Sequence, residues 1–199
     1  MASDPDAALM VAFQGGDESA FRSLFEKHGR AMVAFCHHFV RDGSRAEELA
    51  QDVFLKVHHS AARYQPSARF KTFLYRIASN HCLNELRRGE YAVRRAVENA
   101  EDDQGEPTDP DRLAGPAPTP EENMLAIALG EAVEKLLAQL PEKQRAAFVL
   151  GRLEGLSYEE IADVLDTTIP AVKSLVHRAT VAAAAALAPY AADGKEALP

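Results

Sequence analysis

The sequence LSYEEIADVLDTTIPAVKSLVHR, residues 156–178, decides the fold of the C-terminal half. Ser157 and Glu160 precede an apolar run at the spacing of a capping box, which begins a helix. The turn at residues 166–168 leads to Pro170, and proline is favoured in the first turn of a helix. Helical spacing places Val172, Val176 and Ala179 on the inner face of the last helix. It places Lys173, Ser174, His177 and Arg178 on the outer face. The stretch predicts a helix-turn-helix whose last helix can enter a major groove.

A second block, YQPSARFKTFLYRIASNHCLNELRR at residues 64–88, places basic and amide side chains on one predicted helix. Its polar stripe lies beside the apolar face and consists of Arg76, Asn80, Asn84, Arg87 and Arg88. At about 1.5 Å per residue the stripe is roughly 18 Å long, which matches several nucleotides of backbone. Guanidinium groups bind phosphates and amides contact base edges, so the stripe indicates a DNA-binding face.

Tyr64 and Phe70 flank the loop at the start of this helix, and Lys71 adds a cation there. Aromatic side chains exposed beside a basic groove hold unpaired bases. The alternative is that Phe70 belongs to the core and the arginines form an ordinary solvated face.

Helical spacing covers almost all of the chain outside one acidic stretch, and no alternating run bounded by turns predicts a strand. A length of 199 residues with 47% hydrophobic residues suits one large domain or two small ones and argues against wholesale disorder. We therefore predict an all-α fold of two small helical domains joined by a flexible, acidic, proline-rich linker. The expected segments are a loose N-terminus at 1–16, a first domain at 17–95, the linker at 96–123, a helix-turn-helix domain at 124–188 and a tail at 189–199.

The net charge of −8 argues against a nucleic-acid partner until its distribution is examined. Residues 18–95 hold 14 Lys and Arg against 8 Asp and Glu, a local charge of +6. Residues 96–123 hold 1 Arg against 9 Asp and Glu, a local charge of −8. A basic first domain is thus hidden by an acidic connector, and phosphate binding depends on the local potential.

Local signals set the expected helix ends of the first domain. Its first helix is predicted from about Asp17, with an apolar face of Phe21, Leu24, Phe25, Met32, Phe35, Cys36 and Phe39. Ser44 and Glu47 predict a capping box for the second helix, and Gly89 is placed to end the third. The second helix shows an outer face of Glu48, Gln51, Asp52 and Lys56, whose carboxylates favour a protein partner over DNA.

Other classes of function find little support. The two cysteines, Cys36 and Cys82, lie in apolar helical patterns without a CxxC motif, which is typical of a reducing cytoplasm. No signal peptide or membrane-spanning run is present, and no catalytic motif, metal site or cofactor site is predicted. The histidines lack the spacing of a closed zinc site.

In these two blocks the chain closely resembles the sigma-70 family of bacterial transcription initiation factors, specifically the extracytoplasmic-function (ECF) group. The resemblance covers about residues 17–95 and 124–180. Its motifs are AEELAQDVFLKV, FKTFLYRIASNHCLNELRR, LPEKQRAAFVL and LSYEEIADVL, in the family order and spacing.

The resemblance implies a division of labour. The face with Glu48, Gln51, Asp52 and Lys56 is expected to dock on core RNA polymerase, whose beta-prime clamp and beta flap are the implied contacts. The 64–88 block is expected to recognise and melt the minus-ten element, with Phe70 near a flipped base. The last helix, with Ser157, Tyr158 and Ala171 beside it, is expected to recognise the minus-thirty-five element. An anti-sigma factor is the further partner implied, and the linker resembles the connector that leads towards the RNA exit path.

The chain departs from the family pattern in the helix-turn-helix. The family usually has Gly at Asp166, Gly-Thr at Pro170-Ala171, and often Arg at Leu175 and Thr180. Fewer cations would weaken phosphate contacts. Two other readings stay open from the residues alone: a conventional helix-turn-helix regulator with an N-terminal dimerisation or sensing domain, and a metal-responsive sensor using the histidines.

Overall fold

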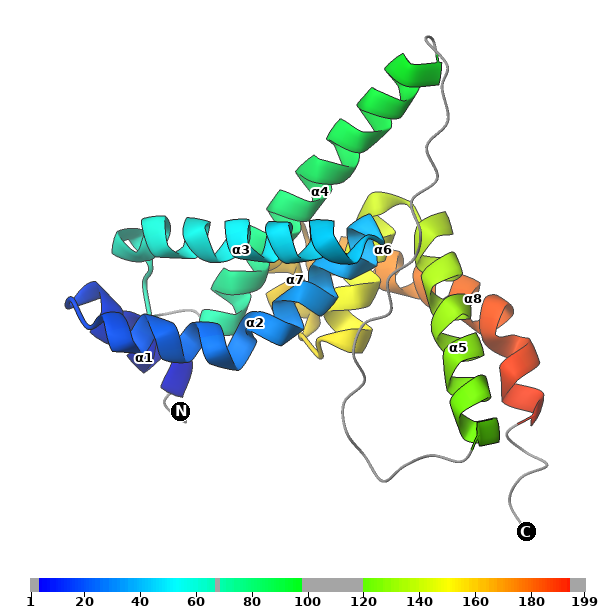
Figure 1. The fold of residues 1–199 in the computed structure, drawn as a ribbon, viewed down its shortest axis with the longest axis horizontal. Helices are drawn as coiled ribbons and strands as arrows, with labels where there is room; N and C mark the ends of the chain where they lie inside the picture. Colours follow the sequence, from blue (N-terminus) through cyan, green and yellow to red (C-terminus); the bar gives the residue numbers. More distant parts are fainter. Residues whose placement is uncertain (1–3, 67–68, 98–119, 194–199) are drawn as a thin grey trace.

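The computed structural model describes the backbone of residues 4–66, 69–97 and 120–193, and side chains within 4–66, 69–88 and 127–190. This part of the chain contains helices and no strand (Figure 1). The helices are α1 (Pro5–Gln14), α2 (Glu18–Val40), α3 (Gly43–Ser60), α4 (Phe70–Val97), α5 (Pro120–Gln139), α6 (Glu142–Phe148), α7 (Tyr158–Val164) and α8 (Ile169–Asp193). Two short turns complete them, a 3₁₀ turn η1 (Ala61–Arg63) and a π turn η2 (Val149–Leu153). The predicted all-α class is confirmed.

The first domain packs α1, α3 and α4 around α2 (Figure 1). Its apolar centre includes Phe35, Phe39 and Tyr75, all almost fully buried. Cys36 of α2 and Cys82 of α4 are free thiols with their Sγ atoms 3.7 Å apart in this core. Both cysteines therefore serve as small packing residues, as their apolar setting predicted.

The prediction of a loose N-terminus at 1–16 is wrong for Pro5–Gln14, which form α1. Asp4 caps α1 by accepting a hydrogen bond from the Asp6 amide at 3.1 Å, and Met10 and Phe13 bury themselves in the core. Asp6 receives hydrogen bonds from Lys27 at 2.6 Å and from His28 at 3.0 Å. Burial alone would raise the pKa of Asp6, but these two partners outweigh it and the pKa is lowered. The local sequence pattern does not predict this short helix next to Gly15-Gly16, because its stability comes from packing on α2.

Several expected helix ends also differ. The α3 helix is capped by Asp42, which accepts from the Arg45 amide at 2.6 Å, and not by Ser44. The α4 helix continues past Gly89 to Val97, since glycine in a helix costs only about 1 kcal/mol. At the C-terminal side, α5 begins at Pro120 before the expected Met124, and α8 extends through Asp193 into the predicted tail. One face prediction fails as well, because Phe25 is 45% exposed.

The second domain packs α5, α6 and α7 against α8. Its core contains Leu137, Leu150, Ile161 and Val172, each at most 1% exposed. The buried apolar residues of both domains form one continuous cluster, because α4 contacts α6 and α7 (Figure 1). Most of the predicted linker, residues 98–119, lies outside the described residues.

Candidate nucleic-acid interfaces

The helix-turn-helix forms as its sequence predicts. The Ser157 amide donates to the Glu160 carboxylate at 2.8 Å, and the Glu160 amide donates to Ser157 Oγ at 3.2 Å, so the capping box is confirmed. In the turn, Asp166 has φ of 48°, a left-handed conformation that favours glycine and that aspartate tolerates better than most residues. The departure from glycine at this position is thus compatible with the turn. Pro170 lies at the second residue of α8.

The outer face of α8 is open. Lys173, Ser174, His177 and Arg178 are exposed, whereas Val172, Val176 and Ala179 are at most 2% exposed. Tyr158 at the start of α7 is 38% exposed, the Ser157 side chain is used by the cap, and Ala171 is partly buried. The predicted separation of inner and outer faces is therefore confirmed.

The two aromatic residues at the start of α4 belong to the core. Phe70 is 0% and Tyr64 is 5% exposed, and their rings meet at 6.3 Å in an edge-to-face arrangement. Burial, and then the charges of Asp4 and Asp6, raise the pKa of Tyr64 to about 12. Of the two alternatives drawn from the sequence, the structure supports the one with Phe70 in the core. The expected exposed aromatic pair is absent from this conformation.

The N-terminal segment fixes this loop. Asp4 Oδ2 accepts from the Phe70 amide at 2.9 Å, the first amide of α4. Gln14 Nε2 donates to the carbonyl oxygens of Ala61 at 2.7 Å and Tyr64 at 2.9 Å. No local pattern in the sequence indicates these contacts, because each spans more than forty residues.

The polar stripe of α4 is only partly free. Arg76, Asn80, Asn84, Arg87 and Arg88 are all exposed, and Lys71 is partly buried. Yet Lys71 Nζ donates to the Glu154 carbonyl at 2.5 Å, and Arg76 Nε donates to the Asp163 carbonyl at 3.0 Å. Arg87 Nε lies 3.2 Å from Glu142 Oε2. The C-terminal domain thus holds three of the predicted DNA contacts.

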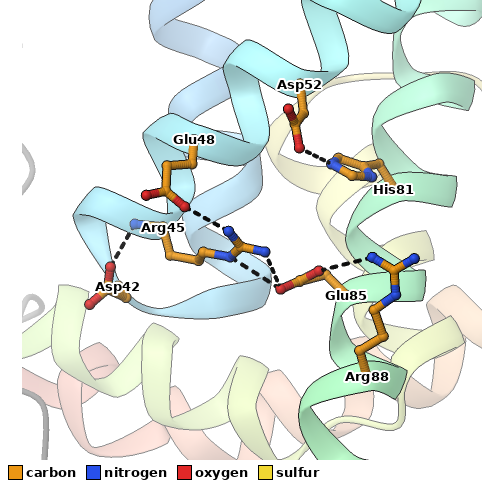
Figure 2. A network of polar contacts seen from close by, with 7 residues as sticks. All are labelled: Asp42, Arg45, Glu48, Asp52, His81, Glu85 and Arg88. Carbon is orange, nitrogen blue, oxygen red and sulfur yellow. Dashed lines mark hydrogen bonds and ion pairs between the residues drawn. The ribbon is translucent and has the colours of Figure 1, made fainter.

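The outer face of α3 carries Glu48, Gln51, Asp52 and Lys56, all exposed as predicted. Figure 2 shows that two of its carboxylates are paired: Arg45 Nη1 lies 2.6 Å from Glu48, and His81 of α4 lies 3.2 Å from Asp52. Arg45 also binds Glu85 of α4. Burial, and then the charge of Lys56, lower the pKa of His81. Arg45, His81 and Glu85 were not predicted as part of this face.

Two features are absent from the described residues. No helix among them is long and apolar enough to cross a membrane. No three His, Cys, Asp or Glu side chains among them gather closely enough to hold a metal ion.

These surfaces define a two-domain helical protein with a helix-turn-helix in its second domain. Comparison with known families places it further: the model of "Sigma-70 region 2" matches residues 24–90 and that of "Sigma-70, region 4" matches residues 130–181. The chain is 33% identical over 192 residues to the RNA polymerase sigma-H factor of Pseudomonas aeruginosa, covering 95% of this chain and 97% of that one. It is 30% identical over 178 residues to the ECF RNA polymerase sigma-E factor of Escherichia coli K12, covering 87% and 90%.

Solved structures share the fold. The structure of CnrH in complex with the cytosolic domain of CnrY matches with a TM-score of 0.67 at 24% identity, over 94% of this chain and 99% of that one. RpoE from Bartonella quintana, in complex with the anti-sigma factor NepR, matches with a TM-score of 0.64 at 22% identity, over 84% and 96%. The chain belongs to the ECF group of the sigma-70 family, whose members act in transcription initiation. Family membership decides against the conventional regulator.

Proposed function

We propose that this protein binds core RNA polymerase and directs it to promoters by contacting two DNA elements with two different helices. The observation that carries the proposal is the open outer face of α8 in a helix-turn-helix, combined with a second basic helix, α4, in the other domain. Two separate DNA-facing helices in one chain suit a factor that positions an enzyme over two elements at a fixed distance.

We assign the minus-thirty-five element to α8. Lys173 and Arg178 supply cations for phosphates, and Ser174 and His177 supply groups that can hydrogen-bond base edges. The four side chains are exposed on one face, and their buried neighbours anchor the helix to the domain. Ser157, Tyr158 and Ala171 lie beside this face, where Tyr158 offers an exposed hydroxyl to the DNA backbone.

The minus-ten element is assigned to α4. Asn80 and Asn84 are exposed between the cations Arg76 and Arg87, an order that suits base contacts flanked by phosphate contacts. Tyr64 and Phe70 are buried in the core, and their role is to fix where α4 begins. The role of Phe70 near a flipped base therefore requires its ring to be uncovered when DNA binds.

The outer face of α3 is assigned to core polymerase, with the beta-prime clamp as its partner and the beta flap as the partner of the second domain. Its carboxylates are unsuited to DNA and remain partly exposed, with Asp52 at 51% and Glu48 at 63%. An anti-sigma factor is a further proposed partner, since the similar structure of RpoE from Bartonella quintana contains the anti-sigma factor NepR. The cytoplasm, where polymerase and DNA are found, is the proposed location.

Run-off transcription tests the assignment. Purified core polymerase and a library of promoter-bearing templates are incubated with and without the protein, and the start sites are aligned. We expect initiation that depends on the protein and start sites that share two upstream elements. Duplex binding without any initiation would refute the sigma assignment for this chain.

A charge reversal tests the polymerase face. Asp52→Arg should weaken the affinity for core polymerase by about tenfold or more, because a complementary charge becomes repulsive in a desolvated contact. Glu26→Arg, an exposed reversal on α2 outside the proposed face, is the matched control. Equal affinities of the two variants would remove α3 from the polymerase interface.

A further inference from the structure

The two ends of α1 are bound to the two ends of the connection between η1 and α4. At the C-terminal end of α1, the side-chain amide of Gln14 donates to the carbonyl oxygens of Ala61 at 2.7 Å and Tyr64 at 2.9 Å, which uses both of its N–H donors. At the N-terminal end, Asp4 Oδ2 accepts a hydrogen bond from the Phe70 amide at 2.9 Å. A helix of ten residues therefore holds the backbone on both sides of this connection.

The carboxylate of Asp4 caps two helices at once. Its Oδ1 accepts from the Asp6 amide of α1 at 3.1 Å, and its Oδ2 accepts from Phe70, the first residue of α4. The carbonyl of Arg69 accepts a bond from the Phe73 amide at 3.2 Å, which places Arg69 at the cap position of α4. An arginine side chain has only donors, so it cannot satisfy the free amides at a helix start. The acceptor comes instead from Asp4, 66 residues away in sequence.

A third contact of α1 reaches the ring of Phe70. The ring centroid of His28, in α2, lies 5.5 Å from that of Phe70, and His28 Nε2 lies 3.0 Å from Asp6 Oδ2 of α1. Asp6 is 8% exposed and also binds Lys27 at 2.6 Å. Asp6 thus orients the imidazole that packs on Phe70. Both the backbone and the ring of Phe70 are therefore supported from α1.

These polar contacts give α1 a role that its packing on α2 does not require. The buried apolar side chains of α1 already anchor it in the core, whereas Asp4 and Gln14 bind backbone atoms outside the helix. We propose that α1 is a positioning element for minus-ten recognition. Asp4 fixes the backbone of Phe70, the residue that the proposed function places near an unpaired base. Gln14 fixes the backbone of Tyr64 on the other side of the connection. The inference rests on the proposed role of α4 in contacting the minus-ten element.

This role is compatible with a ring that moves. An aromatic side chain changes rotamer about its Cα–Cβ bond, so the ring of Phe70 can be uncovered while its amide stays bound to Asp4. A site with a fixed backbone discriminates between bases, because it does not adjust to a base that fits poorly. Without the two contacts from α1 the backbone can adjust. The preference for one base should then weaken more than the general affinity for DNA.

Two substitutions remove these contacts and leave the rest of α1 in place. Asp4→Ser keeps a preferred cap residue for α1 but has a single, shorter side-chain oxygen, so it cannot also serve Phe70. Gln14→Met keeps an unbranched side chain of similar length and removes both donors without a change of charge. The matched control is Asp17→Ser at the start of α2, where Asp17 accepts from the Ser19 amide at 3.0 Å. It makes the same cap substitution and the same change of charge in the same domain.

The preference of the holoenzyme for its own minus-ten bases measures the positioning. Core polymerase is assembled with each variant. The probe is a fluorescein-labelled single strand of about 20 nucleotides that carries the minus-ten sequence obtained from the aligned start sites. Further probes carry one altered base each, and the preference is the ratio of the affinities for the unaltered and altered strands. A mismatch in a recognised site typically costs roughly 5- to 150-fold in affinity, which sets the scale. The affinity for core polymerase is measured in parallel.

We expect Asp4→Ser combined with Gln14→Met to lower the preference by about fivefold or more, because three hydrogen bonds to the backbone are lost. Gln14→Met alone, which leaves both caps in place, should lower it in the same direction. Asp17→Ser should keep the wild-type preference, and all the variants should keep the wild-type affinity for core polymerase.

A purely stabilising role of α1 gives a different result. A smaller fraction of folded protein reduces the apparent affinities for core polymerase and for every probe together and leaves the preference unchanged. An unchanged preference in the double variant, with or without such a general loss, would overturn the proposal. A wild-type holoenzyme that initiates transcription but shows no base preference would reject the minus-ten role of α4, and this inference with it. No initiation at all would reject the proposed function itself.

Discussion

The side chain of His38 should make the stability of the protein fall in mildly acidic solution. His38 lies near the end of α2, and within the described residues its buried Nδ1 has no hydrogen-bond partner. Burial, and then the neighbouring charge of His37, lower the pKa of His38 from 6.5 to about 4. The folded protein therefore excludes a proton that the unfolded chain binds.

The sign and size of the change in stability with pH follow from the difference between the folded and unfolded pKa of His38. Because the folded pKa is the lower one, the contribution is fully present above pH 6.5 and is lost as the pH falls towards about 4. The complete loss is about 3 kcal/mol, and between pH 7.5 and pH 5.0 it is about 2 kcal/mol. This is a large part of the stability of a small domain.

Urea unfolding followed by circular dichroism measures the free energy of unfolding at pH 7.5 and pH 5.0 at one ionic strength. His38→Phe keeps a ring and removes the titration, so its loss between the two pH values should be about 2 kcal/mol smaller than that of the wild type. Ser79→Ala, which removes a buried hydroxyl that does not titrate, should show the wild-type pH difference. Equal losses in the wild type and in His38→Phe would refute the reasoning.

Two further predictions concern α1. Met10→Ala should lower the free energy of unfolding by about 2–5 kcal/mol, because Met10 is 0% exposed, whereas Val11→Ala at a 43% exposed position should change it by less than about 1 kcal/mol in the same urea titration. Gln14→Ala should remove the hydrogen bonds that the Gln14 side chain donates to the carbonyls of Ala61 and Tyr64 and lower the free energy of unfolding by about 1–3 kcal/mol. Faster amide hydrogen exchange at the start of α4 should accompany the Gln14 change, and exchange as slow as in the wild type would contradict the role given to Gln14.

Where local patterns decide the structure, the sequence alone is sufficient to predict it. The capping box at Ser157 and Glu160 and the faces of α8 follow from contacts within one or two turns, so spacing alone predicted them. The position of Asp166 in a left-handed turn also agrees with the glycine expected there. By contrast, α1 was missed because a ten-residue helix with a weak local signal depends on burying Met10 and Phe13 against α2.

The composition and motifs by themselves determined the helical class, the two helices that we propose to face DNA and the family, because these depend on periodicity and on residues close in sequence. Only the tertiary structure decided which of those surfaces are free. Lys71 and Glu154 lie 83 residues apart, and Arg76 and Asp163 lie 87 apart, so no local spacing relates them. The burial of Phe70 arises from packing within the first domain, where its ring meets His28 of α2 and Tyr64. The contacts of Lys71 and Arg76 arise from the packing of the second domain on α4, and long-range packing is a property of the folded chain as a whole.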